Sequence, residues 1–181
     1  IEKRGGKPED PKVYKKMYLD RLWLVIKDRV EALRSGKASP DDYLVPGSRK
    51  LLEGLRAKGL TLYLASGTDH DAVCEEADLL DISKYFTGVF GALDDLKSFS
   101  KAILIKKIIN SAEFAGHEFL AFGDGYVEIE NVKEVGGVAV GIASDEPECL
   151  KIDEWKRKRL VGVGADFMVP NYLELDELFS A

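Results

Sequence analysis

The stretch that decides the fold is "FLAFGDGYVEIENV", residues 119–132. It begins as an apolar run typical of a buried strand and stops at Gly123-Asp124-Gly125. A second carboxylate, Glu128, follows one helical turn after Asp124. A strand-to-helix turn whose aspartate caps the next helix would explain the first acid. A cation site at the edge of a sheet would explain both acids, and residues elsewhere in the chain separate the two interpretations.

The composition of the 181-residue chain suits one domain with room for a small appendage. Apolar residues make up 45% and charged residues 32%, as in ordinary globular proteins. The net charge of -6 argues against a nucleic-acid partner. Cys74 and Cys149 are too few for a disulfide framework and indicate free thiols in a reducing compartment. Neither a membrane-spanning run nor a signal peptide is visible, so we expect a cytoplasmic protein without a membrane partner.

The spacing of apolar residues predicts an alternation of helices and strands. Strands are expected in "LTLYLAS" (60–66), "YFTGVFG" (85–91), "EFLAFGD" (118–124), "GVAVGIA" (137–143) and "DFMVPN" (166–171). Helices are expected over residues 13–33, 48–58, 69–80, 101–111, 128–135 and 153–160. Because single helices separate most successive strands, the sequence predicts βαβ units and a mostly parallel sheet.

Polar residues follow the expected strands where a ligand would bind, since open parallel sheets bind ligands beyond the carboxyl ends of their strands. Ser66 and Gly67 end the first strand, Asp124 ends the third, and Lys101 begins the helix between the second and third. A hydroxyl, an ammonium group and the free N–H groups of helix N-termini suit a phosphate. The carboxylates of Asp124 and Glu128 fit beside a phosphate only with a divalent cation between them. Mg²⁺ is expected, because it takes few carboxylates, several waters and phosphate oxygens.

Three motifs in this order resemble those of the haloacid dehalogenase-like superfamily, most of whose members are Mg²⁺-dependent phosphohydrolases. They are "LYLASG" with Ser66, "SKAILIKKII" with Lys101, and "FGDGYVEIENV" with Asp124 and Glu128. Two further stretches, "VPGSRKLLEGLRAKGLTLYLASG" and "VGVGADFMVPNYLELDELF", are similar to the sequences that surround these motifs in the family. The resemblance implies an α/β fold with a three-layer Rossmann-like parallel-sheet core over residues 44–181. Residues 1–43 resemble part of the helical cap that many members carry.

The resemblance also implies a mechanism and assigns residues to it. An aspartate on the family's first strand attacks phosphorus to form an aspartyl-phosphate, and a second aspartate two positions later acts as general acid and base. The residues that match are Ser66, Gly67 and Thr68 as phosphate contacts, Lys101 as the cation that holds nucleophile and phosphate together, Asp124 as a metal ligand, and Glu128 as a metal ligand through a bound water.

The family's first motif, an apolar strand ending in Asp-x-Asp, is absent from this chain. "LWLVIKD" is the nearest apolar run, but it has helical periodicity and lacks the paired acids. "ASPDD" and "LDDLK" have no strand before them. We therefore expect the nucleophile on a missing N-terminal segment of the same protein, and no activity from this chain alone. The slot for that strand is expected in the middle of the sheet, between the strands that end at Ser66 and Asp124.

Hydrolysis of the phosphate ester of a small metabolite is the function that the resemblance favours. Phosphotransfer, as in sugar-phosphate mutases of the same superfamily, and a regulatory module that binds phosphate without a nucleophile both stay open. Dehalogenation fits less well, because it needs no metal and leaves the two acids without a role.

Plainer interpretations of individual residues stay open as well. In these interpretations Ser66 only ends a strand, and Lys97 takes the place of Lys101 at the phosphate. Glu128 is then a first-turn acid that the helix dipole favours. His70 fits a solvated helix start. The run "KRKR" at 156–159 fits a solvated helix face.

Overall fold

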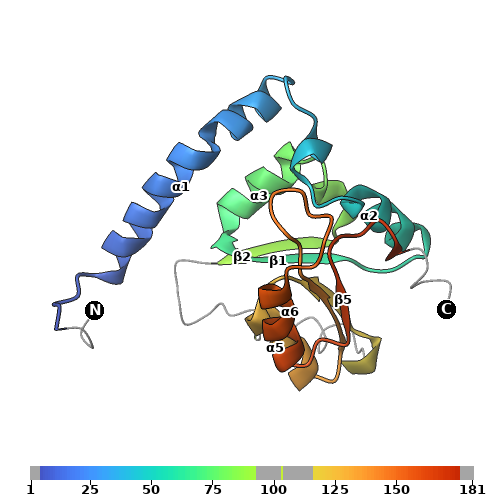
Figure 1. Ribbon diagram of the computed structural model, residues 1–181. Helices are drawn as coiled ribbons and strands as arrows, with labels where there is room; N and C mark the ends of the chain where they lie inside the picture. Colours follow the sequence, from blue (N-terminus) through green and yellow to red (C-terminus); the bar gives the residue numbers. More distant parts are fainter. Residues whose placement is uncertain (1–4, 93–102, 104–115, 176–181) are drawn as a thin grey trace. The chain divides into compact units, whose positions relative to one another are not determined.

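Parallel β-ladders joined through helices make up the framework of this protein (Figure 1). The computed structural model describes residues 5–92, 103 and 116–175. The chain divides into two compact units, Ile1–Asp42 and Tyr43–Ala181. Among the residues described, no helix has both the length and the apolar character needed to cross a membrane.

The first unit is built around one long helix, α1, Pro11–Arg34. Asp10 caps it, because the Asp10 side chain accepts a hydrogen bond from the Lys12 N–H at 2.8 Å. Proline stands at the start of the helix, where no N–H is needed. The helix predicted over residues 13–33 is therefore confirmed. α1 buries none of its side chains, and the assignment of residues 1–43 to a partial cap stays a prediction.

The second unit alternates strands and helices along the chain. Its elements are α2 (Ser48–Ala57), β1 (Tyr63–Asp69), α3 (His70–Leu79), β2 (Gly88–Ala92), β3 (Leu120–Gly123), α5 (Tyr126–Glu134), β4 (Val138–Ile142), α6 (Glu154–Gly162) and β5 (Phe167–Val169). Short 3₁₀ turns lie at Pro40–Tyr43, Ser83–Tyr85 and Gly116–Glu118. All five predicted strands are present, and of the helix predicted over residues 101–111 only Ile103, which is helical, is among the described residues.

The five strands form two parallel ladders. β1 pairs with β2, with Leu64 opposite Val89. β4 lies between β3 and β5, with Val140 opposite both Phe122 and Phe167. Every described ladder between strands is parallel, as the βαβ pattern predicts. The protein therefore has the expected Rossmann-like α/β fold.

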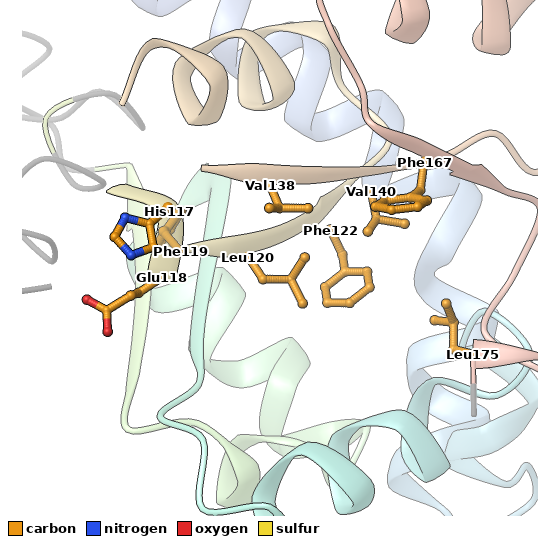
Figure 2. Close-up of a pocket in the computed structure, with 9 residues that line it drawn as sticks. All are labelled: His117, Glu118, Phe119, Leu120, Phe122, Val138, Val140, Phe167 and Leu175. Atoms are coloured by element: carbon orange, nitrogen blue, oxygen red, sulfur yellow. The ribbon is translucent and has the colours of Figure 1, made fainter. Parts of the chain in front are cut away.

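Alternation along β3, β4 and β5 gives their sheet two apolar faces. One face packs against α5 and α6, and its buried centre consists of Ile129, Val132, Ala139, Ala143 and Leu160. The opposite face lines a hollow of about 290 Å³ with Leu120, Phe122, Val138, Val140 and Phe167, and Figure 2 shows these side chains together with Leu175. The strand residues of both sets follow from the period of two, because residues two apart on a strand share a face.

Asp166 ties the beginnings of β4 and β5 to the end of α5. Its carboxylate accepts hydrogen bonds from the Lys133 ammonium and the Ala139 N–H, each at 2.8 Å. The same ammonium donates to the carbonyl of Gly137 at 2.9 Å. The hydrogen bond from Lys133, and then that from Ala139, lowers the pKa of Asp166 below its ordinary value. One carboxylate thus links the helix α5 to two strands of the sheet, β4 and β5.

A cleft of about 530 Å³ separates β1 from β3. The edge of β1 away from β2 and the edge of β3 away from β4 have no partner strand among the described residues. The cleft wall is mainly apolar and includes Leu51, Leu52, Leu55, Leu62, Leu64, Phe86, Phe119, Leu120, Phe122 and Val132. A backbone group left unpaired away from water costs on the order of 1–3 kcal/mol. The groups along this cleft therefore need water or another polypeptide as partners.

Replacing Asp166 by Asn should destabilise the protein by about 1 kcal/mol at pH 7, because the charge-assisted bond to Lys133 is lost while partial exposure limits the value of the ion pair. Since the folded pKa of Asp166 is lowered, its contribution is present above the unfolded value of about 3.9 and is lost as the pH falls through the folded pKa. Urea unfolding of both proteins should therefore give a difference that shrinks below about pH 4.

Asp81→Asn is the matched control for this measurement. Asp81 pairs with Lys84 at 2.6 Å, but its side chain is 59% exposed. We expect its loss to change the free energy of unfolding less than the loss of Asp166 does, because solvent screens an exposed ion pair. Equal effects of the two substitutions would contradict a special role for Asp166.

Candidate functional site

The segment Ser66–Thr68 bulges out of the β1–β2 ladder. Ala65 lies opposite Phe90 and Asp69 opposite Ala92, so three residues of β1 face a single residue of β2. The Thr68 N–H donates a hydrogen bond to the Ser66 hydroxyl at 3.1 Å, which closes a tight turn inside the bulge. The strand was expected to end at Ser66, but β1 continues to Asp69. The three predicted phosphate contacts therefore lie on a bulge, a feature that often re-aims side chains next to an active site.

Gly91 is the single β2 residue that faces this bulge. A Cβ added to Gly91 would lie 2.5 Å from the Cα of His70 and 2.7 Å from the carbonyl oxygen of Thr68. Any side chain at this position would push the two backbones apart. Glycine thus permits the close approach that accommodates the extra residues.

His70 connects α3 to β2. Its Nδ1 accepts a hydrogen bond from the Gly91 N–H at 3.4 Å, and its Nε2 lies 3.8 Å from the sulfur of Cys74. Both ring nitrogens therefore have partners inside the protein. This arrangement supports a structural role for His70, in place of the solvated helix start that the sequence suggested.

Asp124 follows β3 as an exposed carboxylate, and the helix after it begins with Gly125 as N-cap. No side chain caps this helix, so capping does not account for Asp124. The Glu128 carboxylate lies against the Cα of Gly125, because a Cβ added there would collide with it. The two acids therefore meet at one turn, as their spacing in the sequence suggested.

The donor set at this turn fits Mg²⁺ as a partial site. Mg²⁺ is usually held by one or two carboxylates, with water and phosphate oxygens completing the octahedron. Asp124 and Glu128 are acids of the right kind and number. Within the described ranges, no group of three or more His, Cys, Asp or Glu residues is arranged to hold a metal. A cation with a purely protein shell would fit poorly here.

Lys156 was assigned to a solvated helix face, and the structure corrects that assignment. Its ammonium donates to the carbonyl oxygen of Ser144 at 3.0 Å and to Glu146 at 2.7 Å, and its side chain is only 22% exposed. The hydrogen bond to Glu146 raises the pKa of Lys156, and the negative charge of Asp124 adds to the rise. Lys156 thus lies beyond the carboxyl end of β4 and within electrostatic reach of Asp124. The sequence could not single out Lys156, because a run of charged residues in a helix is equally typical of a solvated face.

Tyr172 is a second residue that sequence reasoning missed. Its ring packs edge-on against Phe122, with centroids 5.9 Å apart, and it lines the cleft between β1 and β3. Burial raises the pKa of Tyr172 to about 12, and the charge of Asp124 contributes. The hydroxyl therefore stays protonated at neutral pH, and Tyr172 lies within electrostatic reach of Asp124.

Ser66 lies on β1 and Asp124 directly follows β3, and these two strands lie on opposite sides of one cleft. β1 and β3 lie in separate ladders, and Ala65 and Glu128, which neighbour the two candidates, both line the cleft. No hydrogen bond joins Ser66 to Asp124 in the part of the chain that the structure describes. Lys101 and its alternative Lys97 lie outside the described residues, so their roles stay predictions.

The family described as haloacid dehalogenase-like hydrolase matches residues 18–136, well over half of the chain. Among solved structures, a haloacid dehalogenase-like family protein from Streptococcus pneumoniae is 22% identical, with a TM-score of 0.59 over 74% of this chain and 59% of that protein. A phosphatase from Thermococcus onnurineus is 20% identical, with a TM-score of 0.56 over 75% and 58%. A protein from Thermotoga maritima, described as a candidate beta-phosphoglucomutase, is 21% identical, with a TM-score of 0.63 over 97% and 86%.

At these identities the structural matches support the fold alone. The chain spans less than two thirds of the length of the Streptococcus and Thermococcus proteins. No match is found among curated proteins.

Replacing Gly91 by Ala should destabilise the protein by about 1–3 kcal/mol, because the new Cβ would overlap backbone atoms that cannot rotate away. Thermal or urea unfolding measures this. Gly67→Ala in the facing bulge is the control, since nothing lies within 4 Å of a Cβ there. A tolerated Gly91→Ala protein would mean that the two backbones approach less closely than described.

Asp124→Asn should weaken Mg²⁺ binding by at least roughly 10–100-fold, the usual cost of losing even an outer-shell partner of a metal. Glu128→Gln and Gly125→Ala should have smaller effects, the second because its methyl group displaces the Glu128 carboxylate without removing a charge. Isothermal titration with MgCl₂ measures all three. Glu130→Gln, an exposed acid on the same helix, is the control. Unchanged affinity in Asp124→Asn would exclude the metal site.

Proposed function

Because this chain belongs to the haloacid dehalogenase-like hydrolase family, we propose that it forms most of the active site of an Mg²⁺-dependent phosphatase that acts on a small phosphorylated metabolite. The remaining part, the nucleophilic aspartate, is proposed to come from a segment outside these residues. This chain alone would then bind phosphate and metal without turning over substrate.

The observation that carries the proposal is the position of the two candidate groups around one cleft. The bulge Ser66–Thr68 lies at the carboxyl end of β1. The acids Asp124 and Glu128 follow β3. Since the family's phosphate and metal contacts occupy the carboxyl ends of its strands, this placement supports both assignments. Lys156 and Tyr172 add an ammonium and a phenol on the same side as Asp124.

In the proposed reaction, an aspartate oxygen attacks the phosphorus of the ester. The new phosphorus–oxygen bond forms as the bond to the leaving alcohol breaks, and the second aspartate of the missing motif protonates that alcohol. Water, deprotonated by the same aspartate, then attacks the phosphorus of the aspartyl-phosphate. Inorganic phosphate leaves and the carboxylate is regenerated.

Residues of this chain would orient and stabilise the phosphoryl group during both steps. Ser66 and the N–H groups of Gly67 and Thr68 would donate hydrogen bonds to its oxygens, and the Lys101 ammonium would balance their charge. Asp124 and Glu128 would hold Mg²⁺, which when bound neutralises negative charge on the phosphoryl oxygens.

Phosphotransfer differs from hydrolysis only in the group that accepts the phosphoryl. A sugar hydroxyl in place of water would make the protein a mutase of the same superfamily. The non-enzymatic alternative is a regulatory module that keeps the phosphate pocket but lacks a nucleophile.

The test uses this chain co-produced with a segment that carries an apolar strand ending in Asp-x-Asp. Assays with p-nitrophenyl phosphate and a panel of sugar phosphates should show Mg²⁺-dependent activity in the combined protein and background activity in the chain alone. Phosphorus NMR with glucose 1-phosphate separates released phosphate from an isomerised sugar phosphate. Activity that survives removal of divalent metal would contradict the proposal.

Substitutions then test the individual roles. Asp124→Asn and Lys101→Ala should each lower kcat/KM by at least about 100-fold, as expected for lost charge stabilisation. Lys97→Ala is the matched control for Lys101→Ala. If only the Lys97 variant lost activity, the assignment of Lys101 would be wrong.

A further inference from the structure

We infer that Lys156 is an internal counter-charge for Asp124 that competes with Mg²⁺ for this carboxylate, and that Glu146 holds the Lys156 ammonium back. The inference deepens the proposed function, because it rests on the metal site assigned to Asp124 and Glu128. It adds a role for the loop between β4 and α6, residues 143–153. None of the stretches that resemble the family includes Lys156 or Glu146.

The pairing of β3 with β4 brings Asp124 and the start of this loop to the same edge of the sheet. Gly123 lies opposite Gly141, and the two strands are parallel. Asp124 comes one residue after this pair, and Ser144 comes three residues after it. Since neighbouring parallel strands emerge at one edge, the groups that follow them share that edge.

Hydrogen bonds close the loop, so Glu146 has a defined position on it. The Asp145 N–H donates to the carbonyl of Lys151 at 2.9 Å, and the Lys151 N–H donates to the Asp145 carboxylate at 2.7 Å. Ser144 and Ile152 form an isolated antiparallel bridge. Glu146 therefore lies in a closed turn directly beyond the end of β4.

Lys156 reaches back from the first turn of α6 to this loop. Its ammonium donates to the carbonyl of Ser144 at 3.0 Å and to the Glu146 carboxylate at 2.7 Å. An ammonium group has three N–H donors, so these two contacts leave one for a further partner. Most of the side chain is shielded from water, which strengthens its interaction with nearby charges.

Three acids act on this ammonium. The hydrogen bond to Glu146 is the largest cause of the raised pKa of Lys156; burial opposes the rise, and the charges of Glu146, Asp124 and Asp153 add to it. The Asp153 carboxylate already accepts hydrogen bonds from two N–H groups at the start of α6. Tyr172, which also lies near Asp124, is uncharged at neutral pH because its pKa is raised to about 12. Lys156 is therefore a positive charge that the fold itself brings to Asp124.

A metal ion at Asp124 meets this positive charge. Like charges near one carboxylate oppose each other, and Mg²⁺ carries two units of charge. The Lys156 ammonium therefore lowers the affinity for Mg²⁺ when it is close to Asp124. The Glu146 carboxylate draws the ammonium toward the loop and so favours metal binding without contacting the metal. Glu146 is thus a positioning residue.

Isothermal titration of the 181-residue chain with MgCl₂ tests the role of Lys156. Lys156→Gln should tighten Mg²⁺ binding by roughly 2–10-fold, because the competing charge is lost while the amide can still donate to Ser144. A purely structural role predicts the opposite sign, since damage to the loop would weaken binding. Unchanged or weaker binding by Lys156→Gln would overturn the inference.

Two further variants serve as controls for this titration. Lys156→Arg keeps the positive charge and should bind Mg²⁺ like the unaltered chain. Lys158→Gln makes the same change of charge at an exposed lysine of the same helix, and it should also leave the affinity unchanged. Equal tightening by Lys158→Gln would reduce the effect to net charge and would count against Lys156.

A double-mutant cycle tests the role of Glu146. Glu146→Ala should weaken Mg²⁺ binding by roughly 2–10-fold, because the ammonium is then free to approach Asp124. In the Lys156→Gln chain the same replacement should have little effect, since no ammonium is left to hold. An effect of equal size in both backgrounds would mean that Glu146 acts directly on the metal, and it would overturn the inference.

Glu154→Ala is the matched control for Glu146→Ala. Glu154 also pairs with a cation of α6, Arg157, and its side chain is 66% exposed, against 73% for Glu146. Its loss should leave Mg²⁺ binding unchanged.

The same titrations separate this inference from the proposed function. Mg²⁺ binding that depends on Asp124 but not on Lys156 or Glu146 would reject the inference alone. The expected shifts in affinity, together with no phosphatase activity in the combined protein, would reject the proposed function and keep the inference. Absence of Mg²⁺ binding in both the unaltered chain and Lys156→Gln would reject both.

Discussion

The open edges of β1 and β3 constrain the rest of the second unit. Each strand is held by a neighbour on one side, and the backbone groups on the other side face a cleft walled by α2 and α5. Both halves of the candidate site are attached to these two strands. The predicted phosphate contacts and the two carboxylates therefore lie on opposite sides of this cleft.

Negative charge is the second organising feature of the site. Burial is the main cause of the raised pKa of Tyr172, and the charge of Asp124 adds to it; the same charge adds to the rise in the pKa of Lys156 that Glu146 causes. A negatively charged carboxylate such as Asp124 is stabilised by a cation or a hydrogen-bond donor close to it. The Lys156 ammonium, held by Ser144 and Glu146, meets part of that requirement from the end of β4. The charge of Asp124 thus acts on an ammonium group and a phenol that come from two other segments of the chain.

The local structure of the chain follows from its sequence. Short apolar runs predicted the strands that became β3, β4 and β5, and the single helices between most successive strands predicted parallel pairing. The four-residue separation of Asp124 and Glu128 placed both acids at one turn, because that separation spans one helical turn. These features depend on residues near one another in the chain, so the periodicity of the backbone suffices to predict them.

Other features depend on segments that meet only in the folded protein. The bulge at Ser66–Thr68 requires the close approach of Gly91, 25 positions after Ser66 in the sequence, and no local pattern announces it. Lys156 has the same chemistry as its neighbours in "KRKR", and only its place beside Ser144 turns it toward the site. The sequence by itself determined the positions of the strands, their parallel pairing and the candidate carboxylates. Tertiary structure decided which polar groups share the site and where backbone pairing is incomplete, because both depend on contacts between residues far apart in the chain.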